Sequence, residues 1–330
     1  MRKFAIAGAL IVSSSITCAG LAEAADKVSF VLDWFPSGEV AFPYVGVKEG
    51  FFAAEGIEVQ IDIGRGGADA VKRVASGTDD FGVSALNPLM VAAVESPVPV
   101  KAVMSIYTKQ PDAIFTADGG SITSIGDLTG KTLATATFSS SNALWPVIAK
   151  ANGLDPDTVK LLKVDDNALA PMLALGKVDA VISWVTSEPN DARLLAEQHK
   201  KLKILPWSEH GLSGYGWSLL ASDKIIKERP DTVARFVRAF IKTVKFYADN
   251  PQKVGEDLKS MVPEADLQSN IDEAKATASL VKNEITDRDG YGVFEPSLLK
   301  ETWQWVAKSQ NYPLDKIDPE TLVDRSFVKK

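Results

Sequence analysis

Two tryptophans of the sequence lie where a flat ligand could stack on them. Trp34 follows a β-rich run at 28–32, and Trp184 follows another at 180–183. Stacking on an aromatic ring contributes about 1 kcal/mol beyond the area it buries, so the pair suits a planar solute. Packing inside a core is the alternative explanation for both side chains.

A run of hydroxyl side chains lies between a predicted strand at 131–136 and a predicted helix at 143–152. It consists of Ser139, Ser140 and Ser141. Hydroxyls and free N–H groups at a helix start can hold an anion, because the positive end of the helix dipole points there. The serine run therefore favours a carboxylate, sulfonate or phosphate, with ordinary helix capping as the alternative.

The other half of the chain offers a similar arrangement, since Gly66 and Gly67 precede a predicted helix. Two polar residues, Asn87 and Glu188, also follow short apolar strands. Ligands of open α/β sheets bind beyond the carboxyl ends of strands, so these side chains are candidates to hydrogen-bond a solute. Glu188 would select a donor such as an amine or ring N–H, and a carboxylate facing water is its alternative.

Residues that would support catalysis or metal binding are scarce. The sequence has one cysteine, Cys18, and two histidines, His199 and His210. Cys18 falls in a predicted leader segment, so the mature chain has no thiol nucleophile and no cysteine metal ligand. The histidines show neither metal-site nor triad spacing. We predict no catalytic residue, no metal site and no cofactor, and hence a protein that is not an enzyme.

The 330-residue chain has the composition of a soluble globular protein, with 45% hydrophobic and 24% charged residues. Its net charge is −7 and it has no basic cluster, which argues against a nucleic-acid or membrane partner. Residues 1–24 have the pattern of a signal peptide: Arg2 and Lys3, an apolar run at 4–12, and small residues at 22 and 24. The sequence therefore predicts export to the periplasm after cleavage.

The elements that must position the candidate residues alternate along the chain. Strand–loop–helix units recur at predicted strands 28–32, 57–63, 81–83, 131–136 and 159–164. This alternation predicts α/β structure with parallel strands in doubly wound sheets. Segments 75–84 and 174–183 share Ala, Gly, Asp and Ser in equivalent places, which predicts two similar lobes. A long helix is predicted at 230–249, beginning at a proline and carrying one apolar stripe.

Several runs of the mature chain are typical of one family, namely 32–36, 44–52, 55–59, 64–69 and 127–131. On these runs the chain resembles the solute-binding proteins of bacterial ABC importers. The subgroup contains the sulfonate, taurine and nitrate binders, the thiamine-pyrimidine precursor binders and the fungal pyrimidine synthases. The resemblance implies the two-lobed type II periplasmic binding fold, in which each lobe is a doubly wound, mostly parallel sheet with helices on both faces.

The resemblance also implies boundaries and further site residues. Lobe one would comprise 26–109 plus 215–330, with the C-terminal helices, and lobe two 110–214. Asp33 and Ser37 would contact the ligand, since they lie in and just after the Asp-Trp-Phe-Pro run. Pyrimidine-precursor binders usually carry Asn and then His after this run, where this chain has Ser37 and Val40.

The function implied is that of the periplasmic substrate-binding component of an ABC import system. A monomer would capture a small organic solute in the interlobe cleft and deliver it to an inner-membrane permease and its ATPase. The solute would be heterocyclic, aromatic or anionic, such as a thiamine pyrimidine precursor or a sulfonate. One alternative is a pyrimidine synthase of the same fold, disfavoured by the missing Cys cluster and active-site His. The other is a receptor for a sensor system.

Overall fold

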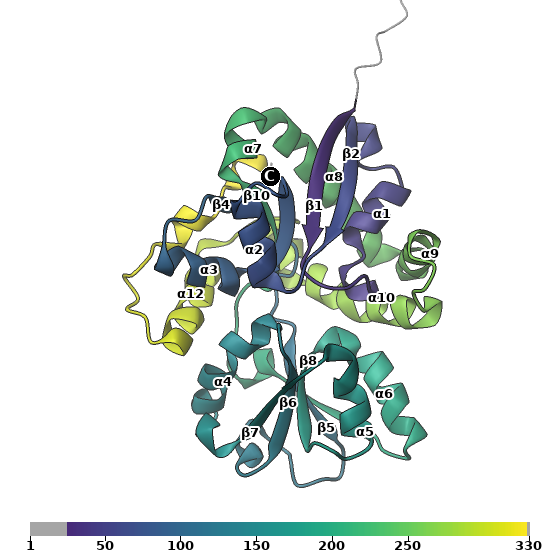
Figure 1. Cartoon of the computed structure of the whole chain (residues 1–330), viewed down its shortest axis with the longest axis vertical. Helices are drawn as coiled ribbons and strands as arrows, with labels where there is room; N and C mark the ends of the chain where they lie inside the picture. The colour runs from purple at the N-terminus through teal and green to yellow at the C-terminus, as the bar shows by residue number, and fades with distance from the viewer. Residues whose placement is uncertain (1–24, 329–330) are drawn as a thin grey trace, which may run out of the picture.

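The computed structural model describes residues 25–328, which form two α/β lobes stacked along the long axis of the molecule (Figure 1). Each lobe contains one five-stranded sheet, with strand orders β2-β1-β3-β10-β4 and β7-β6-β8-β5-β9. In each sheet a single strand, β10 or β5, runs antiparallel to its neighbours. The predicted α/β fold with two lobes of mostly parallel strands is confirmed. The predicted signal peptide, residues 1–24, lies outside the described residues.

The first sheet and its helices are called lobe one. Its strands are β1 (Asp26–Leu32), β2 (Ile57–Ile63), β3 (Phe81–Ala85), β4 (Val100–Ser105) and β10 (Trp217–Ser222). Its helices are α1 (Phe42–Lys48), α2 (Gly67–Ala75), α3 (Leu86–Glu95), α7 (Asp223–Glu228), α8 (Pro230–Asp249), α9 (Pro251–Met261), α10 (Leu267–Val281), α11 (Glu284–Asp289) and α12 (Pro296–Gln310).

The second sheet and its helices are called lobe two. Its strands are β5 (Asp112–Ala117), β6 (Thr132–Ala136), β7 (Lys160–Val164), β8 (Ala180–Trp184) and β9 (Leu202–Pro206), and its helices are α4 (Trp145–Ala151), α5 (Leu169–Ala174) and α6 (Glu188–Glu197). Short 3₁₀ turns also matter to the site: η1 (Gly38–Val40), η4 (Ser140–Ala143), η6 (Asp166–Ala168) and η7 (Val185–Ser187).

The core of lobe one is built by the apolar stripe of α8 against the sheet. Pro230 occupies the first turn of α8, where its missing N–H costs nothing. Phe236 stacks on Phe81 of β3 with ring centroids 4.0 Å apart, and Phe240 stacks on Phe30 of β1. All four rings are fully buried, which contributes about 2 kcal/mol for each side chain. The helix predicted at 230–249 is confirmed. Its packing holds β1 and β3 in place, and the ends of these strands face lobe two.

The chain passes between the lobes at 106–111 and again at 207–216. The two passages lie side by side, since Gln110 donates from Nε2 to the carbonyl of Tyr215 at 2.9 Å. The backbone N–H of Gly216 also donates to the carbonyl of Tyr107 at 3.0 Å. Two short, hydrogen-bonded passages therefore form the hinge.

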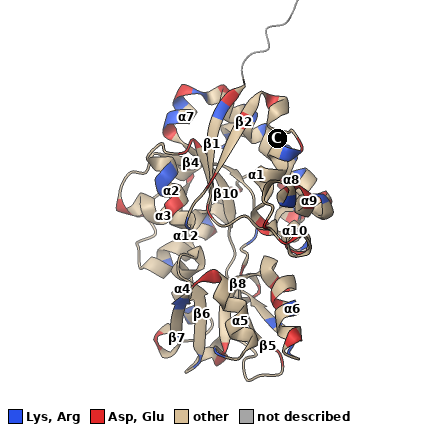
Figure 2. Cartoon of the chain, turned by 45° about the vertical axis from the view of Figure 1, so that its right-hand side comes forward, with Lys and Arg blue, Asp and Glu red and all other residues tan. Residues whose placement is uncertain are grey.

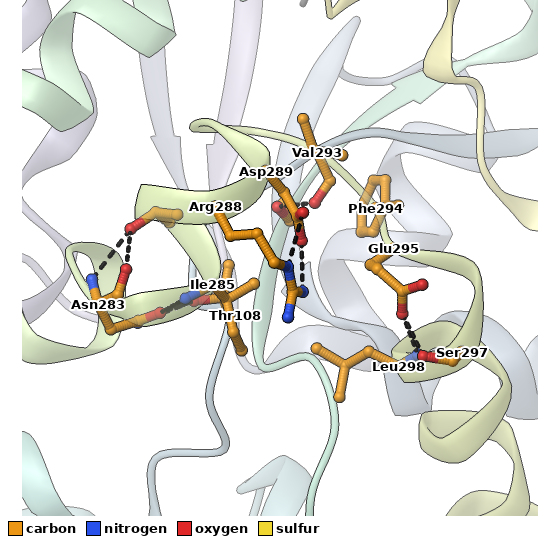
Figure 3. A network of polar contacts seen from close by, with 12 residues as sticks. Thr108, Asn283, Ile285, Arg288, Asp289, Val293, Phe294, Glu295, Ser297 and Leu298 are labelled. Carbon is orange, nitrogen blue, oxygen red and sulfur yellow. Dashed lines mark hydrogen bonds and ion pairs between the residues drawn. The ribbon is translucent and has the colours of Figure 1, made fainter.

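A C-terminal segment around α11 braces this hinge from one side (Figure 3). Asn283 donates from Nδ2 to the Thr108 hydroxyl at 2.9 Å. The Tyr215 hydroxyl donates to the carbonyl of Val293 at 3.2 Å and accepts from the N–H of Glu295 at 2.5 Å. The segment after α10 thus holds both passages.

The outer surface carries charges of both signs, interspersed on helices such as α7 (Figure 2). Among residues 25–328, no helix combines the length and apolar character needed to cross a membrane.

Candidate functional site

A cavity lies between the lobes, at the carboxyl ends of β1, β6 and β8. About 540 Å³ of space there is free of atoms, and part of this space is open to solvent. Both lobes contribute to its walls. This is the place where the topology of doubly wound sheets puts a ligand.

Most of the residues predicted from the sequence line this cavity. They are Asp33, Trp34, Gly66, Gly67, Ser139, Ser140 and Trp184. The strand ends explain their placement. Asp33 and Trp34 follow β1, and Trp184 is the last residue of β8. The glycines stand at the start of α2, and the serines at the start of η4.

The other four predicted residues lie outside the lining. Asn87 donates from Nδ2 to the carbonyl of Ser140 at 2.9 Å, so it holds the serine loop against lobe one. The buried Ser141 hydroxyl donates to Asp112. Glu188 is the first residue of α6, and Ser37 precedes η1 with a buried hydroxyl that has no partner among the described residues.

Two carboxylates in the lining were not predicted. Asp166 opens η6, two residues after the end of β7, and Trp34 donates a hydrogen bond from Nε1 to its carboxylate at 3.4 Å. Its position after a strand is the signal that could have identified it. Glu39 lies in η1, and its carbonyl accepts from the Tyr107 hydroxyl at 2.5 Å. The sequence gives no comparable signal for Glu39.

Burial makes these carboxylates poor acids. Burial raises the pKa of Asp33 to about 7, although Trp217 donates to it from Nε1 at 2.9 Å. Burial, and then the nearby charge of Glu273, raises the pKa of Glu39 to about 8. Burial likewise raises the pKa of Asp166. The cavity therefore binds protons readily, and a positively charged or donor-rich ligand would compete for the same oxygens.

No lysine or arginine is among the described residues that line this cavity. Two further carboxyls lie near this acidic group, and burial raises the pKa of both Asp191 and Glu273 to about 7. The charge of Asp166 contributes to the shift in both cases. An anion placed here would find no cation in the lining, and it would meet like charge wherever these carboxyls are ionised. The electrostatics of the cavity favour cations and hydrogen-bond donors.

The lobes also touch through polar contacts around the cavity. Thr186 of η7 donates to the Glu39 carboxylate, and Asn190 of α6 donates from Nδ2 to Glu273 Oε1 at 2.5 Å. Gly66 has a φ of +105°, and a Cβ there would lie 2.6 Å from the Phe138 carbonyl oxygen of lobe two. The two lobes are therefore in contact around the site, and the close approach at Gly66 requires glycine.

Within residues 25–328, no group of three or more His, Cys, Asp or Glu side chains is placed to hold a metal ion. His199 is exposed after α6, and His210 lies in the second interlobe passage; neither lines the cavity.

Two α/β lobes joined by a double hinge, with a cavity between them, define a periplasmic-binding-protein-like fold. The chain belongs to the NMT1/THI5-like family, whose model matches residues 37–254. This confirms the resemblance drawn from the sequence.

Curated relatives cover most of the chain at low identity. A formylaminopyrimidine-binding protein of Halalkalibacterium halodurans is 23% identical over 286 residues, covering 86% of each chain. The riboflavin-binding protein RibY of Chloroflexus aurantiacus is 25% identical, covering 85% of this chain and 80% of its own. A 4-amino-5-hydroxymethyl-2-methylpyrimidine phosphate synthase of Saccharomyces cerevisiae is 22% identical, covering 72% of each.

Solved structures match the fold over nearly the whole chain. The alkanesulfonate-binding protein SsuA of Xanthomonas axonopodis pv. citri, bound to MOPS, superimposes with a TM-score of 0.69 at 15% identity, covering 91% of this chain and 98% of its own. SsuA of Escherichia coli gives a TM-score of 0.71 at 12% identity, covering 90% of this chain and 97% of its own. At these identities the likeness concerns the fold alone.

Proposed function

We propose that this protein is a receptor for a small aromatic heterocycle that carries hydrogen-bond donors or a positive charge. The observation that carries the proposal is the composition of the cavity. Asp33, Glu39 and Asp166 line it with Trp34 and Trp184, and its described lining contains no cationic side chain. An aminopyrimidine has the matching chemistry, namely a flat ring with an amino donor edge and a ring nitrogen that can take a proton.

In this mechanism the two lobes close on the solute from opposite sides. Trp34 comes from lobe one and Trp184 from lobe two, so the ring would contact an indole from each. The carboxylates accept from the donor edge, and charge-assisted hydrogen bonds of this kind are about twice as strong as neutral ones. Only contacts made to both lobes favour the closed form over the open one, so the solute itself drives closure.

Two of the sequence relatives, named for binding formylaminopyrimidine and riboflavin, support this substrate class over the anions that the serine run favoured. A relative that covers the same share of both chains is named for binding formylaminopyrimidine. The serine loop, in turn, is held by Asn87, by a contact within the loop and by the Ser141 hydroxyl, which donates to the acidic side chain of Asp112. We accordingly assign Ser139 and Ser140 to neutral hydrogen bonds with the solute, and disfavour sulfonates, taurine and nitrate.

We further propose that the receptor is a periplasmic monomer that delivers its solute to an inner-membrane ABC permease and its ATPase. The leader pattern at 1–24 supports export. A structural neighbour from Staphylococcus aureus is described as the ligand-binding component of an ABC-type import system, which supports the same role. Delivery to a sensor rather than a permease is distinguished by whether deleting the receptor abolishes uptake of the solute.

A pyrimidine synthase is the second candidate, favoured by family members that carry that name. Against it, the chain has no cysteine after Cys18, and neither histidine lines the cavity. Turnover of the purified protein, followed by mass spectrometry of any pyrimidine product, decides between the two. A pyrimidine product would overturn the receptor role.

Calorimetric titration of the mature protein, residues 25–330, tests the substrate class. We expect 4-amino-5-hydroxymethyl-2-methylpyrimidine to bind and taurine, alkanesulfonates and nitrate to give no heat. Asp166→Asn should weaken pyrimidine binding about tenfold, because it removes a charged acceptor. Asp157→Asn is the matched control, since this carboxylate of the same lobe is exposed and lies outside the cavity lining. Binding of a sulfonate instead of the pyrimidine would overturn the proposal.

A further inference from the structure

A second hollow adjoins the cavity on its solvent side. We call it the outer chamber, and its lining includes Phe35, Ile63, Arg65, Phe138, Val164 and Asp165. It comprises about 960 Å³, part of it open to solvent. Trp34, Phe138 and Asp166 line both spaces, so the outer chamber is continuous with the interlobe cavity.

Both lobes supply apolar walls to the outer chamber. Phe35 follows β1 and Ile63 ends β2 in lobe one, whereas Phe138 follows β6 and Val164 ends β7 in lobe two. The chamber therefore lies over the outer edge strands of both sheets, while the inner cavity lies nearer their centres. A molecule in the inner cavity that extended along the cleft would enter the chamber between these walls.

The exposure of these side chains is unusual for the molecule. Few large hydrophobic side chains of residues 25–328 are exposed, and three of them line this one chamber: Phe35 at 56%, Ile63 at 48% and Phe138 at 64%. Clustered exposed apolar side chains, rimmed by polar ones, mark a binding surface. Arg65 and Asp165 supply that polar rim.

The aromatic contacts continue from one space to the next. Trp34 packs edge-on against Phe35, with ring centroids 5.9 Å apart and planes at 72°. Because Trp34 also faces the inner cavity, a ligand ring stacked there lies next to the aromatic wall of the outer chamber. The wall therefore extends the binding surface outward from the proposed ring site.

We propose that the outer chamber is a second subsite, which takes a planar, largely apolar group attached to the heterocycle in the inner cavity. This inference rests on the proposed function and narrows it, since the solute becomes a two-part molecule. The inner part carries the donors that the carboxylates select. The outer part lies between Phe35 and Phe138 and covers them from water.

A matched pair of probes tests the subsite. The first is 4-amino-5-hydroxymethyl-2-methylpyrimidine, and the second is its benzyl analogue, in which a phenyl ring replaces the hydroxyl group. Dissociation constants are measured by calorimetry for the mature protein. We expect the benzyl analogue to bind about tenfold more tightly, which is the order of effect for burying a phenyl ring.

Three variants test whether the benzyl group gains its affinity in the outer chamber. Phe35→Ala should remove most of the benzyl advantage and change binding of the first probe by less than about twofold. Phe138 lines both spaces, so Phe138→Ala should weaken the benzyl analogue clearly more than the first probe. Leu175→Ala is the control, because Leu175 is 57% exposed at the end of α5, away from the cleft. All three side chains are largely exposed, so the variants should retain the melting temperature of the parent protein.

The alternatives give different results. Equal affinity for the two probes, unchanged in the variants, overturns the subsite and leaves the proposed function standing. Parallel loss of both probes in the phenylalanine variants also overturns it, because these residues then govern closure rather than the outer group. The phenylalanine variants could also keep full affinity for both probes while cells that carry them lose uptake of the solute. That result would overturn the subsite and assign the rim to contact with the permease. If neither probe binds, the proposed function fails, and the subsite fails with it.

Discussion

Replacing Asp33 with asparagine should stabilise the ligand-free protein at alkaline pH. Asp33 is 6% exposed and accepts a hydrogen bond from Trp217 Nε1 at 2.9 Å, but no cation among the described residues neutralises its charge. An asparagine side chain has nearly the same shape, and its amide oxygen can accept the same indole hydrogen bond. Because the amide carries no charge, its burial costs less free energy than burial of the carboxylate.

The magnitude follows from the pKa of Asp33. Burial raises it from 3.8 to about 7, and each unit of pKa difference corresponds to about 1.4 kcal/mol, so the upper bound is about 4 kcal/mol. The sign follows from proton binding. Between pH 4 and 7 the folded state holds a proton that the unfolded state has released, so stability falls as pH rises through this window. Above pH 7 the penalty is complete, and Asp33→Asn removes it.

Thermal unfolding from pH 4 to pH 8 measures this effect. We expect Asp33→Asn to melt several degrees above the parent protein at pH 8 and to match it at pH 4. The same variant should bind a cationic heterocycle more weakly. A variant less stable than the parent at pH 8 would refute the reasoning, because the carboxylate would then be stabilising in its charged form.

Asp127→Asn is the control, and its effect should have the opposite sign. Thr123 and Ser124 donate hydrogen bonds to Asp127 and lower its pKa to about 2. Its charged form therefore stabilises the fold above pH 4, and this contribution is lost as pH falls towards 2. We expect Asp127→Asn to lower the melting temperature at pH 7 and to approach the parent protein in strong acid.

Three other variants probe closure and the buried site. Gly66→Ala should weaken ligand binding tenfold or more, because the added Cβ would lie 2.6 Å from a carbonyl oxygen of lobe two. Gly77→Ala is the control, since Gly77 also has a positive φ but has no such contact, and its affinity measured by calorimetry should not change. Asn190→Ala removes a 2.5 Å interlobe hydrogen bond and should weaken binding several-fold with little change in melting temperature. Trp217→Phe removes the hydrogen-bond donor of the buried Asp33 carboxylate. The variant should therefore lose more stability, measured by denaturant titration, at pH 8 than at pH 5.

Elements with a local signal could be predicted from the sequence. Alternating residues predict β2 at 57–63, and a proline followed by an apolar stripe predicts α8 at 230–249; both have these bounds in the structure. No element is predicted at α3 or β4, and for the region of β5 the resemblance implies only a strand that crosses between the lobes near 105–115. Both strands are almost entirely buried, so they lack the alternation that marks a half-exposed strand.

The site residues likewise divide into those that have a local sequence signal and those that have none. Trp34 and Trp184 could be proposed because strand ends converge in doubly wound sheets. Glu39 could not, because its position depends on contacts distant in sequence. Tyr107 holds its carbonyl, and the neighbouring N–H of Gly38 donates to Glu273 of α10 at 2.8 Å. No local pattern records such contacts.

The strand orders also bear on how the molecule folds. All five strands of lobe two come from one uninterrupted stretch, 112–206. In lobe one, β10 lies between β3 and β4, so this sheet cannot be completed until residues 217–222 return to it. Closing that long chain loop costs entropy before any contact is gained, and such non-local pairing is slow. We therefore expect lobe two to form first and to act as a tether that brings β10 back to its place.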